Sequence, residues 1–314
     1  MSPPEKPQSK GGGFLLGIDI GGTKCAVVLG DEKMKLYDRI AFPTHSKLGL
    51  KQALKRLMGT IDLILLRNAL KPQALRGAGI SCGGPLDSQK GFILSPPNLP
   101  GWDKVPIVRL IRRKLGCPTR LENDANACAV AEWRYGAGKG CRNLVFLTFG
   151  TGLGAGLILD GRLYRGTNDM AGEAGHIRLA EDGPLGYGKK GSFEGFCSGG
   201  GLARLAAERG LKVSSAKELF EAARRGNRVS RRILQQSARY LGLGLSILVD
   251  LLNPEKIILG GIYARNEKIL RAEMLKVIRH EALARSQSVC RVVPAALGER
   301  IGDVAAMSVA AMEG

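Results

Sequence analysis

The chain has 314 residues, of which 44% are hydrophobic, and a formal net charge of +19 at pH 7. This length allows two domains with cores of their own, and the hydrophobic share is ordinary for a globular protein. No apolar run reaches the roughly 18 residues that a membrane span needs, so no membrane partner is expected. The seven cysteines are scattered and lack C-x-x-C spacing, which indicates reduced thiols in a cytoplasmic protein.

Residues 1–13 are rich in Pro, Lys, Ser and Gly and contain no apolar core, so they are interpreted as a flexible tail and not as a signal peptide. An apolar run then ends at Asp19, and a second run returns from Cys25. Adjacent glycines between two strand-like runs indicate a hairpin. Because a glycine tip carries no side chains, an anion can approach its amides, and Asp19 could hold a metal ion near that anion. An ordinary hairpin with a polar turn remains the alternative. The turn consists of Gly21, Gly22, Thr23 and Lys24.

A strand at 35–43, a helix at 47–70 and a strand at 75–81 are predicted next from composition and apolar spacing. The last of these leads into a Gly-Gly-Pro loop that contains Gly84. Such a loop can press its backbone against a ligand, or it can be a plain turn. The proline-rich stretch 95–102 predicts a rigid irregular segment that contains Asn98.

A basic helix is predicted at 106–115 and a strand at 119–122, after which Asn123 and Asp124 open a helix at 125–135. An aspartate at a helix start is by default an N-cap. The same position also holds a carboxylate rigidly, as a catalytic base would require. The two interpretations are compatible.

Residues 144–163 repeat the strand, Gly/Thr turn and returning strand around Thr151 and Gly152. Neither glycine turn is a P-loop or a dinucleotide fingerprint, because each leads into a strand and not into a helix. Two such hairpins suggest a duplicated architecture that grips one polyphosphate from both sides. Helices at 214–225, 229–252, 267–283 and 301–312 and strands at 256–259 and 291–294 are predicted for the last third of the chain.

Four motifs occur in order: DIGGTK at 19–24, ENDAN at 122–126, TFGTGLG at 148–154 and EAGH at 173–176. Together they resemble the ROK family of sugar kinases and repressors, most closely its bacterial glucokinases, over residues 14–312. The resemblance implies an α/β, actin-like (ribonuclease H-like) fold whose two domains close on sugar and ATP. The implied domains are 14–122 with 299–314, and 123–298.

The resemblance also implies a role for individual residues. Asp124 would be the catalytic base that orients the sugar hydroxyl and accepts its proton, as phosphoryl transfer to an alcohol requires. Asp19 would act indirectly on Mg²⁺. The implied sugar-binding residues are Gly84, Asn98, Asn123, Glu173, His176 and Glu194. The implied nucleotide-binding residues are Asp19, Gly21, Gly22, Thr23, Lys24, Thr151, Gly152, Gly260 and Gly261. Without the resemblance, a lone histidine such as His176 more often serves packing or capping, and Glu194 could simply begin a helix.

The chain departs from the family at one point. Many members follow this histidine with three cysteines that bind structural zinc together with it, whereas the aligned positions here are Leu185, Tyr187 and Ser192. Leucine has no ligand atom, and neutral Tyr and Ser are poor zinc ligands. The sequence therefore predicts no zinc site, which leaves open what orients the ring of His176.

The predicted activity is ATP-dependent phosphorylation of a hexose at its 6-hydroxyl, with glucose as the first choice. The alternatives are a kinase for fructose, mannose, N-acetylmannosamine or N-acetylglucosamine, a glucokinase that uses polyphosphate, and a sugar-sensing repressor. Repressors of the family carry an N-terminal helix-turn-helix domain, for which the 13 residues before the first strand are too few. No nucleic-acid partner is expected, a homodimer is expected because dimers are common in the family, and the basic charge is interpreted as solvated helix faces.

Overall fold

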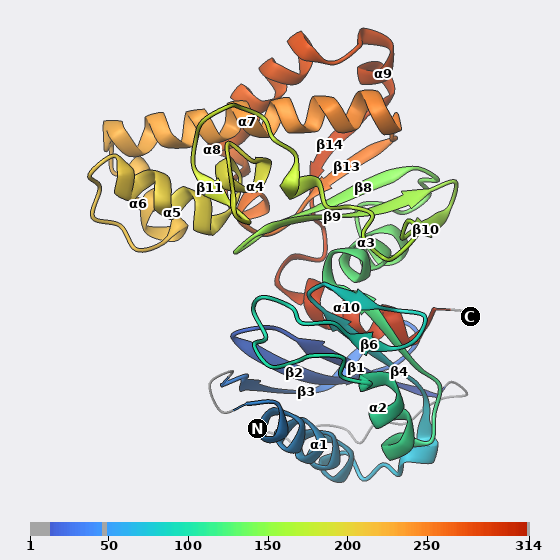
Figure 1. The fold of residues 1–314 in the computed structure, drawn as a ribbon. Coiled ribbons are helices and arrows are strands. Elements are labelled where there is room, and N and C mark those ends of the chain that lie inside the picture. The colour runs from blue at the N-terminus through green and yellow to red at the C-terminus, as the bar shows by residue number, and fades with distance from the viewer. Residues whose placement is uncertain (1–12, 46–48, 313–314) are drawn as a thin grey trace, which may run out of the picture. The chain divides into compact units, whose positions relative to one another are not determined.

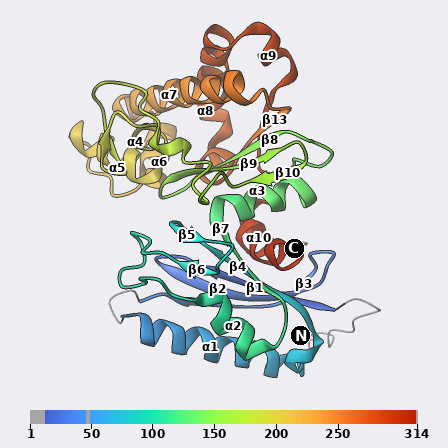
Figure 2. The same cartoon turned by 45° about the vertical axis from the view of Figure 1, so that its right-hand side comes forward.

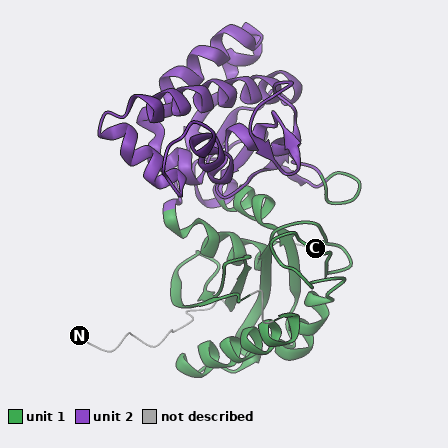
Figure 3. Cartoon of the chain, turned by 60° about the vertical axis from the view of Figure 1, so that its left-hand side comes forward, with its two compact units in different colours: residues 1–131, 166–170, 299–314 green, residues 132–165, 171–298 purple. Residues whose placement is uncertain are grey.

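The computed structural model describes residues 13–45 and 49–312. The chain divides into two compact units, which Figure 3 colours green and purple. Unit 1 consists of Met1–Ala131, Gly166–Met170 and Glu299–Gly314, and unit 2 consists of Glu132–Arg165 and Ala171–Gly298. Except for Gly13, the predicted tail lies outside the described residues.

Unit 1 is built on a sheet with the strand order β3-β2-β1-β4-β7. The strands β1, β2 and β3 form an antiparallel meander, and β4 and β7 continue the sheet in parallel with β1. The strands β1, β2 and β4 are rich in buried aliphatic residues, as expected where a sheet is covered on both faces. The strand bounds are β1 (Phe14–Ile20), β2 (Lys24–Gly30), β3 (Leu36–Pro43), β4 (Leu75–Cys82) and β7 (Thr119–Asn123).

Helices cover both faces of this sheet, as Figures 1 and 2 show. The helices α1 (Gly49–Arg67) and α2 (Ile107–Leu115) lie on one face, and α10 (Ile301–Ala310) lies on the other. Leu57 and Ile61 of α1 and Ile111 of α2 are buried in one cluster with the strands. A small hairpin of β5 (Leu86–Asp87) and β6 (Phe92–Ile93) follows β4, and the 3-10 turn η2 (Pro72–Ala74) precedes it.

Unit 2 is built on a second sheet, in the order β10-β9-β8-β13-β14. Again an antiparallel hairpin, β8 and β9, is extended by parallel strands on one side. Buried residues of α7 and α8, such as Leu245 and Met274, pack into the same cluster as Val145 and Ile257 of the sheet. The strand bounds are β8 (Leu144–Phe149), β9 (Leu153–Leu159), β10 (Arg162–Tyr164), β13 (Lys256–Leu259) and β14 (Arg291–Pro294).

The helices of unit 2 lie in the segments of chain that connect its strands (Figure 1). They are α4 (Phe193–Phe196), α5 (Gly199–Glu208), α6 (Ala216–Arg224), α7 (Arg228–Leu252), α8 (Gly261–Glu281) and α9 (Ala284–Val289). Shorter elements are η3 (Ala174–His176), β11 (Leu185–Gly186), β12 (Lys189–Lys190) and η4 (Gly298–Arg300). The sequence did not predict α5, because glycines at its first turn disfavour a helix.

The chain passes from unit 1 into unit 2 inside α3 (Asp124–Tyr135), between Ala131 and Glu132. The sequence placed this boundary between residues 122 and 123. The first turns of α3 are counted with unit 1 because the helix starts directly at the end of β7, which is hydrogen-bonded into that sheet. Residues 166–170 also belong to unit 1, where Asp169 accepts hydrogen bonds from the amide and hydroxyl of Ser88.

The other predicted elements are present, with differences at their ends. The helix predicted at 267–283 begins earlier, at Gly261, and Asn266 interrupts its backbone with a non-helical φ of −130°. The first two residues of the helix predicted at 47–70 lie outside the described residues. Within the described ranges, no helix is both long enough and apolar enough to cross a membrane.

Gly79 allows α10 to lie directly on the sheet of unit 1. A Cβ atom at this position would lie 2.9 Å from the backbone carbon of Val309 and would also collide with the Ala306 carbonyl and the Ala310 amide. Backbone atoms cannot move aside as a flexible side chain can. The missing side chain at Gly79 is therefore a condition for the packing of α10.

We expect Gly79→Ala to lower the free energy of unfolding of unit 1 by about 3 kcal/mol, the upper range for overpacking a core. Urea unfolding followed by the fluorescence of Trp102, which is buried in unit 1, measures this in a Trp133→Phe background, because the second tryptophan belongs to unit 2. Gly59→Ala is the matched control, because Gly59 lies in α1 and a Cβ atom there would meet nothing within 4 Å. That change should stabilise the helix by about 0.5 to 1 kcal/mol. Equal effects of the two variants would contradict the packing argument.

Candidate active site

The β1–β2 hairpin of unit 1 presents free backbone amides at its tip. The Gly21 amide donates to the Lys24 carbonyl at 3.1 Å, which closes the turn. Thr44, after β3, holds the turn from outside by donating its hydroxyl to the Gly21 carbonyl at 2.5 Å. Among the described residues, the amides of Gly22 and Thr23 donate to no acceptor. Two adjacent unpaired amides are suited to binding an anion.

Four predicted residues of unit 1 lie beside this hairpin. A Cβ atom on Gly22 would lie 2.6 Å from the Asn98 carbonyl oxygen, so the proline-rich segment packs directly on the glycine tip. A Cβ atom on Gly83 would lie 3.5 Å from Asn98 Nδ2 and 4.0 Å from Asp124 Oδ2. The corresponding position on Gly84 is 3.3 Å from Asn123 Nδ2. The structure thus brings together Gly84, Asn98, Asn123 and Asp124.

The start of α3 corrects one detail of the sequence interpretation. Asn123, and not Asp124, caps the helix: its Oδ1 accepts hydrogen bonds from the amides of Ala125 at 2.9 Å and Asn126 at 3.3 Å. Asp124 is the first helical residue, and its Oδ1 accepts from the Ala125 amide at 2.8 Å. An asparagine caps a helix as well as an aspartate does, which is why the pattern alone did not separate the two residues. The result leaves Asp124 Oδ2 and Asn123 Nδ2 available to a ligand.

Asp19 lies at the end of β1 in a strongly acidic environment. Burial, followed by repulsion from Asp124 and Asp303, raises the pKa of its carboxyl to about 7, although Lys24 and Arg39 act in the opposite direction. A carboxylate in this situation is costly to ionise in the free protein. A bound cation would offset that cost, because it supplies the missing opposite charge.

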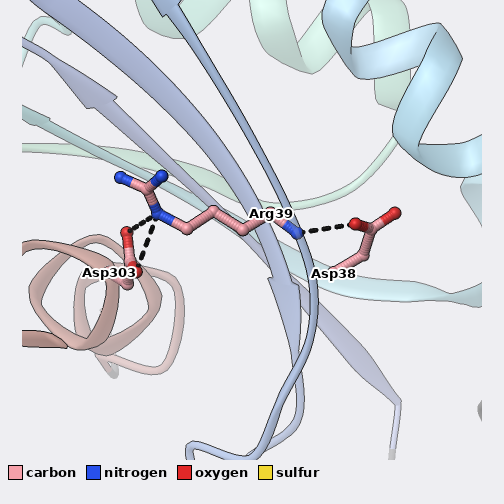
Figure 4. Close-up of polar contacts among 3 residues, drawn as sticks. All are labelled: Asp38, Arg39 and Asp303. Carbon is pink, nitrogen blue, oxygen red and sulfur yellow. Dashed lines mark hydrogen bonds and ion pairs between the residues drawn. The ribbon is translucent and has the colours of Figure 1, made fainter. Parts of the chain in front are cut away.

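An ion pair from a distant part of the chain lies next to this carboxylate. Figure 4 shows Arg39 of β3 with its Nε atom 2.9 Å and 3.0 Å from the two carboxylate oxygens of Asp303 at the start of α10. The neighbouring Asp38 turns to the other side of the strand and pairs with Arg67 of α1 at 3.2 Å. Arg39 therefore partly neutralises Asp303, whose charge would otherwise act on Asp19 without compensation. The motif search did not single out either residue of this pair.

Asp124 has a milder electrostatic environment. Loss of surrounding water raises the pKa of its carboxyl, while the hydrogen bond from the Ala125 amide lowers it. Solvent nevertheless reaches the residue. Because solvent screening limits the effect of the surrounding protein, the exposed carboxylate can ionise and accept a proton.

The β8–β9 hairpin of unit 2 repeats the arrangement of unit 1. The Gly150 amide donates to the Gly152 carbonyl at 3.0 Å, and within the described ranges the amides of Thr151 and Gly152 have no acceptor. The first amides of α5 fix the turn: Gly199 donates to Gly150 at 2.8 Å and Gly200 donates to Thr151 at 3.2 Å. A second anion-binding tip is thus built into unit 2.

Glu194 is held against this second hairpin. Its Oε2 accepts a hydrogen bond from the Leu153 amide at 3.0 Å, and it would lie 2.7 Å from a Cβ atom on Gly152. The turn η3 packs against the same hairpin through Gly175. A side chain at Gly175 would collide with the Leu153 carbonyl and approach Glu194, so the close packing requires glycine. Glu173 and His176, at the two ends of this turn, are both exposed. The predicted residues Glu173, His176, Glu194 and Gly152 are therefore neighbours within unit 2.

A hairpin occupies the place where other family members are expected to carry zinc ligands. Tyr187 and Gly188 connect β11 to β12, both with positive φ, and the Tyr187 ring meets the His176 ring edge-on at 5.6 Å between centroids. Lys189 Nζ donates to the His176 carbonyl at 2.8 Å. Ser192 is buried and caps α4 by accepting a hydrogen bond from the Gly195 amide. The Tyr187 ring therefore packs on the imidazole of His176, while Lys189 holds the backbone of that residue.

A cavity of about 790 Å³ adjoins the hairpin of unit 2. One side is formed by the glycines at the start of α5, and Lys217 and Arg265 bring positive charge to it. Arg224 donates to Asn266 at 2.5 Å along the lining. The sequence did not point to this cavity, since its walls come from α5, α6 and α8, whose residues carry no motif. The lining consists of Gly150, Thr151, Gly199, Gly200, Ala203, Ser214, Ser215, Ala216, Lys217, Phe220, Glu221, Arg224, Ile262, Arg265 and Asn266.

Gly260 and Gly261 do not line this cavity themselves. A Cβ atom on Gly261, which has a φ of +59°, would lie 2.9 Å from the backbone carbon of Phe149, and one on Gly260 would meet the Phe146 ring. The two glycines let α8 start against β8, and the next turn of that helix, with Ile262 and Arg265, reaches the cavity. Gly260 and Gly261 therefore position the part of α8 that forms one wall of the cavity.

Two α/β units, each with a glycine hairpin at the end of its first strand, form the actin-like fold of sugar kinases. The chain belongs to the ROK family, whose match covers residues 15–312. It is an enzyme of the sugar kinase class.

Curated relatives and solved structures agree with this assignment. A glucokinase from Streptomyces coelicolor is 31% identical over 95% of this chain and 98% of its own length. An N-acetylmannosamine kinase from Salmonella typhi is 34% identical over 78% of this chain and 82% of its own length. The crystal structure of a ROK family glucokinase from Streptomyces griseus, in complex with glucose and AMPPNP, has a TM-score of 0.78 and 30% identity, and it covers 95% of this chain and 99% of its own.

Proposed function

We propose that this sugar kinase transfers the γ-phosphoryl group of ATP to the 6-hydroxyl of glucose. The observation that carries the proposal is the group formed by Asp124, Asn123 and Asn98 around Gly83 and Gly84, beside a hairpin with free amides. The glucokinases among the relatives support glucose as the substrate, and the glucokinase complex with AMPPNP supports ATP as the donor.

In the proposed mechanism, Asp124 accepts a hydrogen bond from the 6-hydroxyl and then its proton. Its free Oδ2 suits this role, because Oδ1 is occupied by the Ala125 amide and keeps the carboxylate in place. Proton removal as the hydroxyl attacks prevents a positive charge from forming on the new ester oxygen. Since phosphoryl transfer depends mainly on positioning and charge, we assign Asp124 an orienting role as well.

The remaining sugar hydroxyls are assigned to polar side chains of both units. Asn123 offers Nδ2, because its Oδ1 caps α3. Asn98, Glu173 and His176 are exposed, and Glu194 keeps Oε1 free while Oε2 binds the Leu153 amide. Sites built in this way reject analogues that lack a hydroxyl, since a buried polar group would lose its partner.

The donor phosphates are assigned to the two glycine hairpins. Thr23 and Lys24 of unit 1 and Thr151 and Gly152 of unit 2 supply amides, hydroxyls and one ammonium group. The cavity of unit 2 has the volume of a small-molecule site and is the proposed place of the adenosine. Lys217 and Arg265 would add attraction for the negatively charged nucleotide.

The residues near Asp19 fit a magnesium ion. Carboxylate oxygens are the ligands that Mg²⁺ prefers, and it commonly binds through one or two of them together with substrate phosphates. The raised pKa of Asp19 indicates an uncompensated negative site. When bound with the nucleotide, Mg²⁺ neutralises phosphate charge during transfer. The chain's contribution is to hold Asp19 at the end of a buried strand.

A coupled kinase assay over glucose, fructose, mannose, N-acetylmannosamine and N-acetylglucosamine, with ATP or polyphosphate, tests the proposal. We expect the highest kcat/KM for glucose with ATP. The likeness to the Salmonella typhi kinase makes N-acetylmannosamine the second candidate. If another sugar had a higher kcat/KM, the proposal that glucose is the substrate would be wrong. If polyphosphate alone supported turnover, the proposal that ATP is the donor would be wrong.

We also propose that the enzyme needs no zinc. Leu185 has no ligand atom, neutral Tyr187 is a poor zinc ligand, and the Ser192 hydroxyl serves as the cap of α4. Elemental analysis of protein purified without added metal should find well under one zinc per chain, and activity should survive a zinc-selective chelator with Mg²⁺ in excess. A stoichiometric zinc lost together with activity would contradict this.

The hairpin beside His176 makes a related prediction. Tyr187→Ala removes the ring that packs on His176, so we expect the KM for glucose to rise several-fold with little change in kcat. Tyr187→Phe keeps the edge contact and should behave like the wild type. A variant with alanine at Tyr164, an exposed tyrosine on β10, controls for losing a surface aromatic residue. Equal KM values in Tyr187→Ala and wild type would contradict an orienting role.

We also propose that the enzyme is a cytoplasmic homodimer and that it binds no nucleic acid. All seven cysteines are free, which agrees with a reducing compartment. Light scattering on the purified chain measures the oligomeric state directly.

A further inference from the structure

Another cavity, of about 450 Å³, lies in unit 1, and four of its six lining residues are cationic. None of the residues assigned to sugar, nucleotide or magnesium lines it. The lining consists of Gln89, Lys90, Val108, Arg109, Arg112 and Arg113. We call it the cationic pocket.

The three arginines share one face of α2. Positions 109, 112 and 113 are spaced by three and four residues, which places them together on a helix surface. The opposite face of α2 is buried in the core through Ile107, Ile111 and Leu115. Because the apolar face fixes the rotation of the helix, the guanidinium groups must gather on its outer side.

This arrangement works against the stability of the helix. Like charges three or four residues apart repel each other. Arg109 also lies in the first turn, where the helix dipole disfavours a cation and where α2 has no acidic residue. Within the described residues, Arg109 and Arg113 have no carboxylate or carbonyl partner. An anion between them would relieve all of these repulsions.

The backbone around the pocket is anchored. Gly91, with a φ of +75°, lets the β5–β6 turn reach α2, where the Val108 amide donates to the Gly91 carbonyl at 3.3 Å. Arg112 Nη2 donates to the Thr119 carbonyl at 3.2 Å. Lys90 pairs with Asp87 at 3.3 Å, so its ammonium group is held at the turn. The backbone that carries the cations therefore belongs to a fixed surface and not to a loose segment.

We propose that the cationic pocket binds a small phosphate-bearing ligand with at least two negative charges, separately from the site of phosphoryl transfer. Arginine guanidinium groups match phosphate oxygens in pairs, and several of them around one hollow favour a multiply charged ligand over chloride. The volume admits a sugar phosphate or a short chain of phosphates. Both carry the chemistry that the pocket recognises.

The proposal is tested by calorimetric titration at physiological salt, with AMPPNP and glucose already present in excess. Sodium tripolyphosphate and glucose 6-phosphate are the two probes. We expect the wild type to bind at least one probe, and Arg109→Ala combined with Arg113→Ala to weaken that binding at least tenfold. Arg112 is left intact because it supports the Thr119 carbonyl.

Arg232→Ala combined with Arg239→Ala is the matched control, since it removes the same charge from exposed positions on α7. Its binding should equal that of the wild type. Raising the salt should weaken binding steeply in the wild type and less steeply in the Arg109/Arg113 variant, because fewer phosphate contacts remain. Preference for tripolyphosphate would identify a linear polyphosphate, and preference for glucose 6-phosphate a sugar phosphate.

Absence of binding by both probes to the wild type would overturn the proposal, as would equal losses in the two double variants. Circular dichroism of the Arg109/Arg113 variant establishes that it is folded. If it is not, Lys90→Gln combined with Arg113→Gln, outside the first turn of α2, takes its place with the same expected tenfold loss. Failure of sugar phosphorylation would leave this binding test unaffected, because no substrate is turned over in it.

Discussion

Replacing Asp124 by Asn is expected to lower kcat at least about a hundredfold, the lower range for loss of a general base. The amide keeps the size of the carboxylate, and the helix keeps its cap, because that cap is Asn123. The variant can still accept a hydrogen bond from the sugar hydroxyl, so the KM for glucose should change little. What it loses is the ability to take up the proton.

The measurement is a steady-state assay of both kinetic constants over glucose and ATP. Asp182→Asn serves as a control for removing a carboxylate, since Asp182 is exposed and its ion pair with Lys190 is long at 3.8 Å. It should leave both constants unchanged. A kcat near the wild-type value in Asp124→Asn would end the assignment of the base.

Replacing Asp19 by Asn should have opposite effects on activity and stability. We expect kcat to fall by about a hundredfold, which is the size of effect seen when one group that stabilises transition-state charge is removed. We also expect the ligand-free variant to be more stable than the wild type at neutral and alkaline pH. The reason is that the wild-type protein must then hold a charge that burial, Asp124 and Asp303 all disfavour.

The pH window of the stability effect follows from the two pKa values. In the unfolded chain Asp19 titrates near its ordinary value, and in the folded protein its pKa is about 7. Below both values it is neutral in either state, so the substitution changes nothing. As the pH rises between them, the folded protein retains a proton that the unfolded chain releases, and the wild type loses stability relative to the variant. Above pH 7 the difference becomes constant.

Urea unfolding of the two proteins from pH 4 to 9, without magnesium or nucleotide, measures this difference. The slope cannot exceed about 1.4 kcal/mol per pH unit and should be smaller, because solvent reaches part of the side chain. Asp303→Asn removes one of the repulsions and frees Arg39, and both changes lower the pKa of Asp19, so the window should move toward lower pH. A stability difference that does not depend on pH would contradict the raised pKa.

The predicted hairpins illustrate what sequence patterns specify well. Gly21-Gly22 and Gly150-Thr151-Gly152 lie between strand-like runs, and their conformation depends on local chemistry that the pattern contains. Both hairpins are present, with register pairs such as Ile20 with Cys25 and Phe149 with Leu153. The family motifs likewise lie at strand ends, where local order determines which side chains can meet.

The parts that the sequence did not predict depend on contacts between distant segments. Apart from Gly150 and Thr151, the unit 2 cavity is lined by residues outside the motifs, so only the packing of helices brings Lys217 and Arg265 to the same cavity. The pairing of Arg39 with Asp303 joins residues 264 positions apart. The cap at Asn123 required a choice between two good capping residues, and hydrogen-bond geometry decided it.

The place of α10 in unit 1 has a consequence for biosynthesis. The helix packs over Gly79 of β4, a strand that is synthesised more than 200 residues earlier. At a synthesis rate of roughly 5 to 20 residues per second, this separation is a delay of roughly 10 to 40 seconds. During this interval one face of the first sheet remains without its cover, while unit 2, which ends at Gly298, can already form its core. Domains usually mature in the order of their translation. Here the final ten-residue helix, Ile301–Ala310, makes the N-terminal unit the last to be completed, and until then a chaperone would find its exposed apolar strands.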